Sequence, residues 1–321
     1  MRVFVTGATG FIVGEVARRL RARGDEVVAL VRDPDRVQGL DYELVRGDLG
    51  DAGAIRHGLA GCDAAVHGAA VYQVGVSGKA AAAMREANVG GTERVLGAAL
   101  ELGTAKVVHV STIAVFGNTQ GQIVDETSAP ASPPLAVYDE TKREAHEVAT
   151  RLIGSGLPCA IVQPGAVYGP GDPSQLGGTL RRVAAGRMPL IAFADCGLNA
   201  VHRDDVAGGI LLALDRGRAG EAYVLGGELT TLGAMAATVA RVTGHRAPHS
   251  LPPSLLRGIA RVSPRFRDLV ASSDGVTYWA SDEKARRELG YAPRGMEQGL
   301  KDTLAAEGLL QSSPLPHRQR S

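Results

Sequence analysis

The sequence has few cysteines and few aromatic residues. Its 321 residues include only Cys62, Cys159 and Cys196, and aromatic side chains make up 4% of the chain. An odd number of widely spaced cysteines excludes a disulfide framework and a zinc site of the Cys-x-x-Cys type. We therefore expect no metal site, and a reducing, cytoplasmic compartment fits this composition best.

The sequence also lacks an excess of charge of one sign and any long hydrophobic run. Its 35 basic side chains are balanced by 34 acidic ones. Without a basic surface, nucleic acid and membrane are not expected partners. No apolar stretch approaches the roughly 20 residues that a membrane helix needs, and the N-terminal run has no cleavage signal. A small molecule is the expected partner.

What the sequence does contain is an alternation of short β-branched runs with stretches of helical period, which is typical of a parallel sheet covered by helices. Strands are expected at 3–5, 27–31, 42–45, 64–67, 106–110, 160–162 and 223–225. Helices are expected at about 11–23, 51–59, 78–102, 137–154, 178–186, 204–215, 231–243 and 282–289. The predicted fold class is α/β, a Rossmann-type doubly wound parallel sheet with a smaller, discontinuous C-terminal substrate domain.

A change of composition after Pro164, where Gly-rich and Pro-rich loops begin, predicts the domain limits. The nucleotide-binding domain is expected to comprise residues 1–165 and about 200–227. The substrate-binding region is expected to comprise about 166–199 and 228–310. Residues 311–321, rich in Ser, Pro and Arg, are expected to form a flexible tail.

The strongest local motif is TGATGFIVG at 6–14, between the first strand and the first helix. Glycines there allow a tight turn, so that backbone N–H groups and the helix N-terminus can approach a pyrophosphate. Because a strand and a helix flank the motif, we interpret it as a dinucleotide-binding loop rather than an ordinary turn.

Arg32 follows the second strand, where such a fold meets the adenosine ribose. An arginine there can pair with a 2′-phosphate, whereas an acidic residue accepts the 2′-hydroxyl. Arg32, with Arg36 one turn further, favours NADP(H) over NAD(H), which stays possible. The alternative is that both arginines are solvated surface charges. Asp48 can hold the adenine amino group or cap the helix that starts near Asp51.

Tyr138 and Lys142 lie four residues apart on a predicted helix, so that they face the same site. A tyrosine hydroxyl, with a pKa of about 10, is a poor acid or base at neutral pH. A nearby ammonium, together with an oxidised nicotinamide, lowers that pKa. We therefore predict that Tyr138 moves a proton, while Thr112, at the end of a strand, hydrogen-bonds the substrate oxygen.

These motifs resemble the extended short-chain dehydrogenases/reductases, also called the NAD-dependent epimerase/dehydratase family, over about residues 1–308. Within that family the sequence is most similar to the dihydroflavonol-reductase-like branch. The matching segments are TGATGF at 6–11, GDL at 47–49, HGAA at 67–70, NVGGT at 88–92, VSTIAVFG at 110–117, YDETK at 138–142, QPGAVYGPGD at 163–172, NAVHRDDVA at 199–207 and SDEKARRELGYAPR at 281–294.

The resemblance implies a role for each matching position. Thr112, Tyr138 and Lys142 match the catalytic residues, with Tyr138 as general acid/base and Lys142 on the nicotinamide ribose. The implied cofactor-binding residues are Gly7, Thr9, Gly10, Phe11, Ile12, Arg32, Asp48, Leu49, Ala69, Ala70, Asn88, Ser111, Tyr138, Lys142, Pro164, Gly165, Ala166 and Val167. The resemblance also implies a homodimer in which the helices at 78–102 and 137–154 pair between subunits.

Two positions depart from the family pattern. Val13 stands where the third glycine of the loop is usual, and Gly14 does not replace it. Because a β-branched side chain there is expected to push the helix outward, we predict that Val13→Gly tightens cofactor binding. Phe116 replaces the usual Tyr, and we expect this change to alter only substrate contacts.

Substrate contacts are predicted from the position of a few side chains in the chain. The candidates are Tyr72, Gln73, Thr112 and His202. For His202 a purely structural role is the alternative. Asp204 and Asp205 are interpreted as caps of the helix that follows them.

Three functions stay open at this point. A reductase or dehydrogenase exchanges NADP(H), a sugar-nucleotide epimerase keeps NAD tightly bound, and a cofactor-sensing protein catalyses nothing. The intact Tyr138 and Lys142 pair disfavours the sensor. A sugar-nucleotide 4,6-dehydratase is also disfavoured, since Ile113 and Ala114 occupy the positions where its pattern has an Asp-Glu pair. Arg32 favours the reductase over the epimerase.

Overall fold

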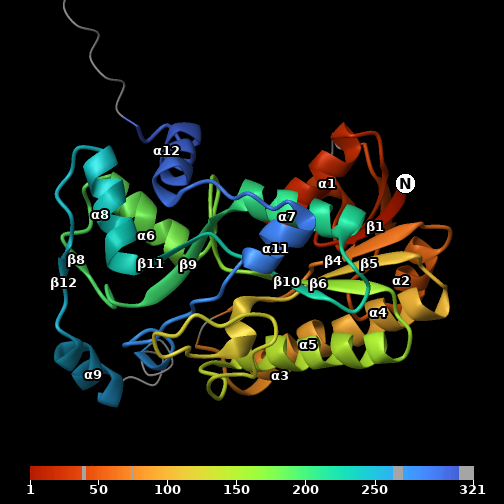
Figure 1. Ribbon diagram of the computed structural model, residues 1–321, viewed down its shortest axis with the longest axis horizontal. Coiled ribbons are helices and arrows are strands. Elements are labelled where there is room, and N and C mark those ends of the chain that lie inside the picture. The colour runs from red at the N-terminus through yellow and green to blue at the C-terminus, as the bar shows by residue number, and fades with distance from the viewer. Residues whose placement is uncertain (38–40, 74, 263–269, 311–321) are drawn as a thin grey trace, which may run out of the picture.

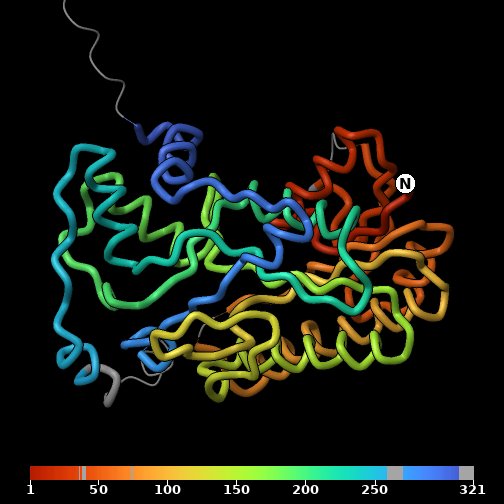
Figure 2. Tube along the Cα trace, viewed as in Figure 1, coloured from red at the N-terminus to blue at the C-terminus, as the bar shows by residue number. Residues whose placement is uncertain are grey.

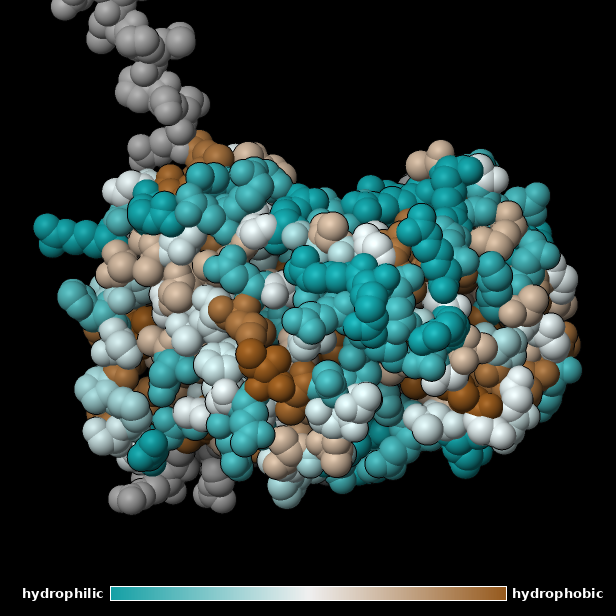
Figure 3. Space-filling view, viewed as in Figure 1, coloured by the Kyte–Doolittle hydropathy of each residue, from teal (hydrophilic) through white to brown (hydrophobic). Residues whose placement is uncertain are grey.

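The computed structural model describes residues 1–37, 41–73, 75–262 and 270–310, so the predicted tail at 311–321 lies outside the described residues. Two parts lie side by side in Figure 1. A large sheet with its helices occupies the right of the view, and a group of helices with short strands occupies the left. No described helix is long and apolar enough to cross a membrane, and the face drawn in Figure 3 is mostly hydrophilic.

The large sheet has seven parallel strands. In spatial order they are β10 (Ala222–Leu225), β6 (Cys159–Pro164), β5 (Lys106–Val110), β4 (Ala64–His67), β1 (Arg2–Thr6), β2 (Glu26–Val31) and β3 (Glu43–Arg46). The strand order reverses between β1 and β4, and doubly wound folds bind ligands at such a point, beyond the carboxyl ends of the strands. The predicted α/β fold class is confirmed, and each of the seven predicted strands is present.

Helices cover both faces of this sheet (Figure 1). One face packs against α1 (Val13–Ala22), α7 (Arg203–Arg216) and α11 (Glu283–Leu289). The other packs against α2 (Ala52–Leu59), α4 (Gly91–Glu101) and α5 (Val137–Gly154). In β1, Val3 and Val5 belong to the first core and Phe4 to the second, because successive side chains of a strand point to opposite faces. Burial on both faces explains why these strands are continuously apolar.

The helix expected at 78–102 is composed of three segments that follow one another directly. They are α3 (Gly78–Arg85), a π-helical turn η2 (Glu86–Gly90) and α4. The π-helical turn was not predicted, and such turns frequently occur at functional sites. Two short 3₁₀ helices, η1 (Pro34–Val37) and η3 (Ile113–Phe116), follow β2 and β5.

Of the smaller part, only the helices at 178–186 and 231–243 were predicted. Its three-stranded sheet has the order β11 (Glu228–Thr231), β9 (Gly197–His202) and β7 (Ala166–Tyr168), and β8 (Leu190–Ile191) pairs with β12 (His249–Ser250). A separate core joins this sheet to α6 (Gln175–Ala184), α8 (Leu232–Val242) and α12 (Met296–Ala306). The helix α9 (Pro253–Val262) follows β12. The residue limits of the two predicted domains stay a prediction.

The segment 276–281 connects the two parts. It runs beside the long loop after η3 (Figure 2), where Thr119 N–H donates to the Thr277 carbonyl at 2.8 Å and Val124 N–H to the Trp279 carbonyl at 3.1 Å. On its other side, Tyr278 N–H donates to the carbonyl of Gly197 in β9 at 3.0 Å. A segment near the end of the chain therefore holds the loop after β5 against the smaller sheet.

Candidate active site

The glycine-rich loop between β1 and α1 forms a tight turn. Gly7 has a φ of +88°, and Gly10 N–H donates to the Gly7 carbonyl at 2.8 Å. A Cβ at Gly7 would lie 3.0 Å from the backbone nitrogen of Ala69. The N–H groups of Phe11 and Ile12 have no hydrogen-bond partner among the described residues, and no side chain caps α1. This geometry fits a pyrophosphate, which such unpaired N–H groups at a helix start bind well.

Arg32 and Asp48 follow the neighbouring strands β2 and β3. Arg32 is exposed directly after β2. Asp48 is also exposed, and its Oδ1 accepts the N–H of Gly50 at 2.7 Å. The N-cap residue of α2 is Asp51, so the helix-capping role that was the alternative for Asp48 is filled by Asp51. The side chain of Arg36 lies outside what the structure describes.

The other residues implied in cofactor binding lie at the carboxyl ends of the central strands. Thr9, Leu49, Ala69, Ala70, Ser111 and Gly165 follow β1, β3, β4, β5 or β6 in the chain, Pro164 is the last residue of β6, and Ala166 and Val167 begin β7 directly after it. The topology therefore brings them to the edge of the sheet where a doubly wound fold binds its nucleotide.

Asn88, in the π-helical turn, holds the loop after β4. Its Oδ1 accepts the N–H of Val71 at 2.7 Å, and its Nδ2 donates to the Val71 carbonyl and to Thr141 Oγ1, both at 3.0 Å. Thr141 belongs to α5, so Asn88 ties this loop to the helix that bears the predicted catalytic residues. Asn88 thereby fixes the backbone directly before Tyr72.

Tyr138 and Lys142 stand in the first two turns of α5. Lys142 is 5% exposed, its Nζ donates to the Val110 carbonyl at 2.9 Å, and burial lowers its pKa to about 8. Burial raises the pKa of Tyr138 well above its usual value, and Tyr72 and Asp139 raise it further. Desolvation is thus the largest effect on the pKa of Tyr138 in the protein alone. The predicted lowering of this pKa by an ammonium together with an oxidised nicotinamide stays a prediction.

Thr112 and Ser111 differ in what their hydroxyl groups contact. Ser111 Oγ is hydrogen-bonded to Nδ1 of His146 at 3.0 Å. Thr112 Oγ1 accepts the N–H of Ala114 at 3.2 Å, which caps η3 and leaves its hydroxyl hydrogen free to donate. Only Thr112 lines the cavity described next.

A cavity of about 730 Å³ opens between the large sheet and the smaller part. Thr112 and Tyr138 lie in its wall, together with Tyr72 and Gln73, and the Tyr72 ring meets the Tyr138 ring edge-on at 4.7 Å between centroids. The smaller part contributes mostly apolar side chains, namely Leu176, Met188, Ile191, Phe193, Leu198 and Leu232. Among the described residues that line the cavity, Asp139 is the one acid and Arg182 the one base.

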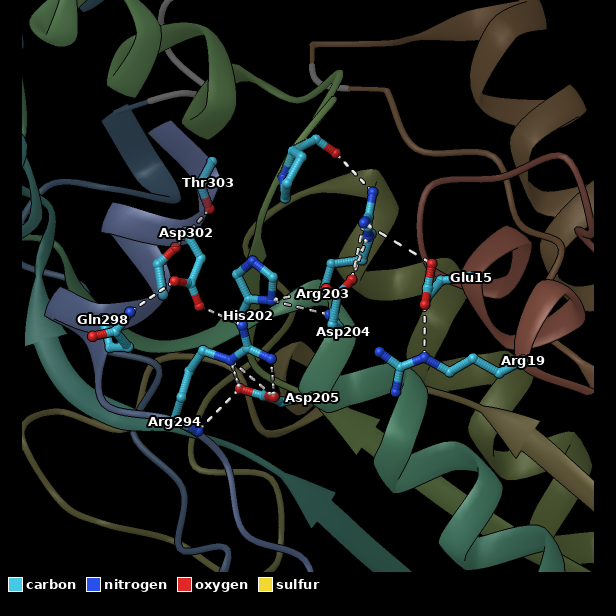
Figure 4. Close-up of polar contacts among 12 residues, drawn as sticks. Glu15, Arg19, His202, Arg203, Asp204, Asp205, Arg294, Gln298, Asp302 and Thr303 are labelled. Atoms are coloured by element: carbon cyan, nitrogen blue, oxygen red, sulfur yellow. Dashed lines mark hydrogen bonds and ion pairs between the residues drawn. The ribbon is translucent and has the colours of Figure 1, made fainter. Parts of the chain in front are cut away.

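His202 lies at the end of β9, outside the lining of this cavity (Figure 4). It is buried, and its Nδ1 accepts the N–H of Asp204 at 3.2 Å, so that it caps α7. The predicted substrate contact is therefore replaced by the structural role left open as its alternative. The predicted capping role of Asp204 and Asp205 is wrong, because they lie in the first turn and pair with Arg203 and Arg294.

Val13 fits the helix-to-sheet contact because of a second glycine. Its side chain is 4% exposed, and a Cβ at Gly68, after β4, would lie 2.4 Å from Val13 Cγ2. The valine thus fills space that Gly68 leaves open. The reason for expecting Val13→Gly to tighten cofactor binding, a helix pushed outward, does not apply to this structure.

Comparison with known proteins agrees with this geometry. Residues 3–226 match the model of the NAD dependent epimerase/dehydratase family. The chain is 33% identical to "Sterol demethylase protein B" of Methylococcus capsulatus (95% of this chain, 98% of the relative). It is 32% identical to a 4-hydroxy-2-methyl-3-oxo-4-farnesyl-3,4-dihydroquinoline-1-oxide ketoreductase of Stigmatella aurantiaca (99% and 100%).

The fold also superposes on a solved structure of a DesIV double mutant, a dTDP-glucose 4,6-dehydratase from Streptomyces venezuelae with NAD and DAU bound. The TM-score is 0.79 at 28% identity, and the superposition covers 96% of this chain and 97% of that one. The chain belongs to the NAD-dependent epimerase/dehydratase family. It is an enzyme of the extended short-chain dehydrogenase/reductase type, and its cofactor is a nicotinamide dinucleotide.

Proposed function

We propose that this enzyme is an NADPH-dependent reductase of a small, largely apolar carbonyl compound. The observation that supports this best is the cavity, in which Tyr138 and Thr112 face mostly apolar side chains. A sugar nucleotide has a charged diphosphate and many hydroxyl groups, which need several cations and hydrogen-bond donors. Arg182 is the one cation among the described lining residues, which disfavours a sugar-nucleotide epimerase.

The preference for NADP(H) rests on Arg32. Its guanidinium stands exposed after β2, where it can form a bidentate contact with a 2′-phosphate. Gly7, Gly10 and the N–H groups of Phe11 and Ile12 would hold the pyrophosphate. NAD(H) remains the alternative cofactor.

The proton chemistry is assigned to Tyr138 and its neighbours. The bound nicotinamide supplies the hydride. Tyr138 donates its phenolic proton to the substrate oxygen, and Thr112, whose hydroxyl hydrogen is free, donates a hydrogen bond to the same atom. The raised pKa of Tyr138 keeps the phenol protonated at neutral pH, which is the form that reduction needs. Lys142, anchored on the Val110 carbonyl, would hold the nicotinamide ribose.

Two measurements test the proposed function. The first is to denature freshly purified protein, identify any nicotinamide released, and titrate the cofactor-free protein with NADPH and NADH. The second is to follow NADPH oxidation with a panel of apolar ketones and aldehydes. A cofactor-free protein that prefers NADPH and reduces such ketones supports the reductase. Stoichiometric retained NAD would favour the epimerase, and Arg32 would then be a solvated surface charge without a contact to the cofactor.

We infer further that the protein acts as a homodimer in the cytoplasm. The three cysteines, Cys62, Cys159 and Cys196, are free thiols, in keeping with a reducing compartment. The helices α4 and α5 lie next to each other on one side of the sheet, where the family resemblance implies the dimer contact. Light scattering at micromolar concentration tests this, and a monomer would count against it.

A further inference from the structure

The helix α6 carries two neighbouring arginines that differ in their surroundings. The guanidinium of Arg181 donates to the carbonyl of Asp172 at 2.8 Å and pairs with the carboxylate of Glu307 at 3.3 Å. Arg182 lines the substrate cavity instead and is exposed. Within the described part of the chain its side chain has no ion pair, and its one hydrogen bond runs from Nε to the carbonyl of Gly178 at 3.3 Å. Arg181 therefore has a structural role, whereas most of the donors of Arg182 are unused.

The spacing of residues on α6 places the guanidinium of Arg182 on the cavity side of the helix. The cavity-lining residues of this helix are spaced by three or four, which puts side chains on one face. They are Gln175, Leu176, Gly178, Thr179 and Arg182. The side chain of Arg182 runs back over Gly178, and a Cβ at Gly178 would meet no atom within 4 Å. The guanidinium thus lies beside an open part of the cavity wall, where a ligand can reach it.

A guanidinium without a partner at an apolar wall attracts an anion. Its terminal nitrogens carry N–H donors in one plane, which matches the two oxygens of a carboxylate. Leu176, Met188 and Phe193 line the same cavity, and such apolar surroundings strengthen an ion pair relative to one in open water. Because Arg182 is the one cation among the described lining residues, it suits a group with a single negative charge.

Asp139 determines the direction in which an anionic substrate lies in the cavity. It is the one acid among the described lining residues and stands next to Tyr138 in α5. Burial raises the pKa of Asp139 to about 6, so that it is mainly ionised at neutral pH and repels a carboxylate. The helix α5 covers the large sheet, whereas α6 belongs to the smaller part (Figure 1). An anionic group is therefore favoured at the wall of the smaller part, away from Tyr138.

We propose that Arg182 binds a carboxylate of the substrate, so that the enzyme selects an oxo acid in which an apolar chain separates the carboxylate from the reacting carbonyl. This assignment rests on the proposed function, since it presumes a carbonyl at Tyr138 and Thr112. The apolar side chains of the cavity pack against the chain between the two groups. Arg182 is thus a specificity-determining residue and takes no part in the transfer of hydride or proton.

Three methyl-ketone acids of increasing length are suitable probes, namely 5-oxohexanoate, 7-oxooctanoate and 9-oxodecanoate. The methyl ester of each acid keeps the ketone and the chain but has no charge. Dissociation constants are measured by calorimetry on the full chain saturated with NADP⁺. We expect the acid of the best-fitting length to bind about 5- to 20-fold more tightly than its ester, as for a bidentate ion pair that stays partly exposed. Equal affinities of acid and ester at every length, or no measurable binding of any acid, would overturn the proposal.

Substitutions of Arg182 separate recognition of the charge from packing. Arg182→Gln should abolish the preference for the acid while leaving the affinity for the ester intact, and Arg182→Lys should retain part of the preference. Arg182→Glu should reverse it, so that the ester binds more tightly than the acid. The matched control is Arg187→Gln, an exposed arginine that follows α6 and does not line the cavity. If Arg182→Gln keeps the preference, or weakens acid and ester equally, the assignment is wrong.

Salt gives a second measurement, and turnover separates this proposal from the proposed function. Because Arg182 is exposed, the preference for the acid should fall when NaCl is raised from about 0.05 M to about 0.5 M. A preference that does not change with salt contradicts the assignment. Reduction of acids and esters by NADPH with equal kcat/KM would leave the reductase standing and remove the role of Arg182. Tighter binding of the acids that is lost in Arg182→Gln, without reduction of any probe, would support the carboxylate contact and count against the reductase.

Discussion

Replacing Lys142 with methionine should change how the stability of this enzyme depends on pH. Burial lowers the pKa of Lys142 from 10.5 to about 8. The unfolded chain therefore binds the ammonium proton of Lys142 more tightly than the folded protein does, so protonation of Lys142 as the pH falls favours unfolding. This loss of folding free energy is fully present below about pH 8 and disappears as the pH rises toward 10.5. A shift of about 2.5 pKa units corresponds to about 3 kcal/mol.

The Lys142→Met variant isolates this contribution. Its free energy of unfolding minus that of the wild type should decrease by about 2–3 kcal/mol between about pH 7 and pH 10. The Val110 carbonyl that loses its donor costs about 1–3 kcal/mol, but this cost is the same at both pH values and cancels. Titration of tyrosines and cysteines is common to both proteins and cancels as well.

Urea unfolding of both proteins at the two pH values provides the measurement, followed by the fluorescence of Trp279, the single tryptophan. A free-energy difference between variant and wild type that is the same at both pH values would refute the reasoning. It would mean that the folded protein does not penalise the charge on Lys142. We also expect Lys142→Met to damage both turnover and cofactor affinity, since the proposed function places the Lys142 ammonium on the nicotinamide ribose.

Three further predictions follow from the site. Tyr138→Phe should lower turnover by about 10²- to 10⁴-fold with cofactor affinity almost unchanged, and full activity in steady-state assays would remove Tyr138 from the mechanism. Val13→Gly should destabilise the protein by about 1–3 kcal/mol, because it opens a cavity beside Gly68 and places a glycine in α1. Urea unfolding and an NADP⁺ titration check this. Tighter NADP⁺ binding by the variant would support the sequence-based expectation that Val13 pushes α1 outward. Arg32→Ala should weaken NADPH binding by about tenfold or more but leave NADH binding unchanged. Arg56→Ala, an exposed control on α2, should alter the binding of neither cofactor. Equal losses of NADPH and NADH affinity in Arg32→Ala would contradict the 2′-phosphate contact.

The sequence was sufficient for the large sheet because its strands are buried on both faces. Runs such as that around Phe4 have no polar alternation, and the helices between them have the right length for crossovers. The spacing of Tyr138 and Lys142 was readable because four residues on a helix place two side chains on one face. The π-helical turn at 86–90 gave no such signal, since its residues also suit an ordinary α-helix.

The smaller part and the cavity depend on contacts between distant segments. The strands β7, β9 and β11 are three to six residues long and pair across more than one loop, so no local pattern marks them. His202 was suggested as a substrate contact because of its place in a motif, but its neighbours in space make it a helix cap. Asp139 was missed as a cavity residue because its acidic position in the first turn of α5 looks like ordinary capping. The fit of Val13 depends on Gly68, which is distant in sequence and lies after β4.

The hydrogen bonds of segment 276–281 set an order for completing the active site during synthesis. Thr112 and Tyr138 emerge from the ribosome long before Thr277 and Trp279, whose carbonyls hold the loop between those two predicted catalytic residues. A nascent chain that ends before Val276 contains all seven strands of the large sheet and the whole glycine-rich loop, but it lacks these carbonyls and Tyr278 in the cavity wall. The glycine-rich loop is therefore made well before the substrate cavity and α11, which covers the large sheet, are complete.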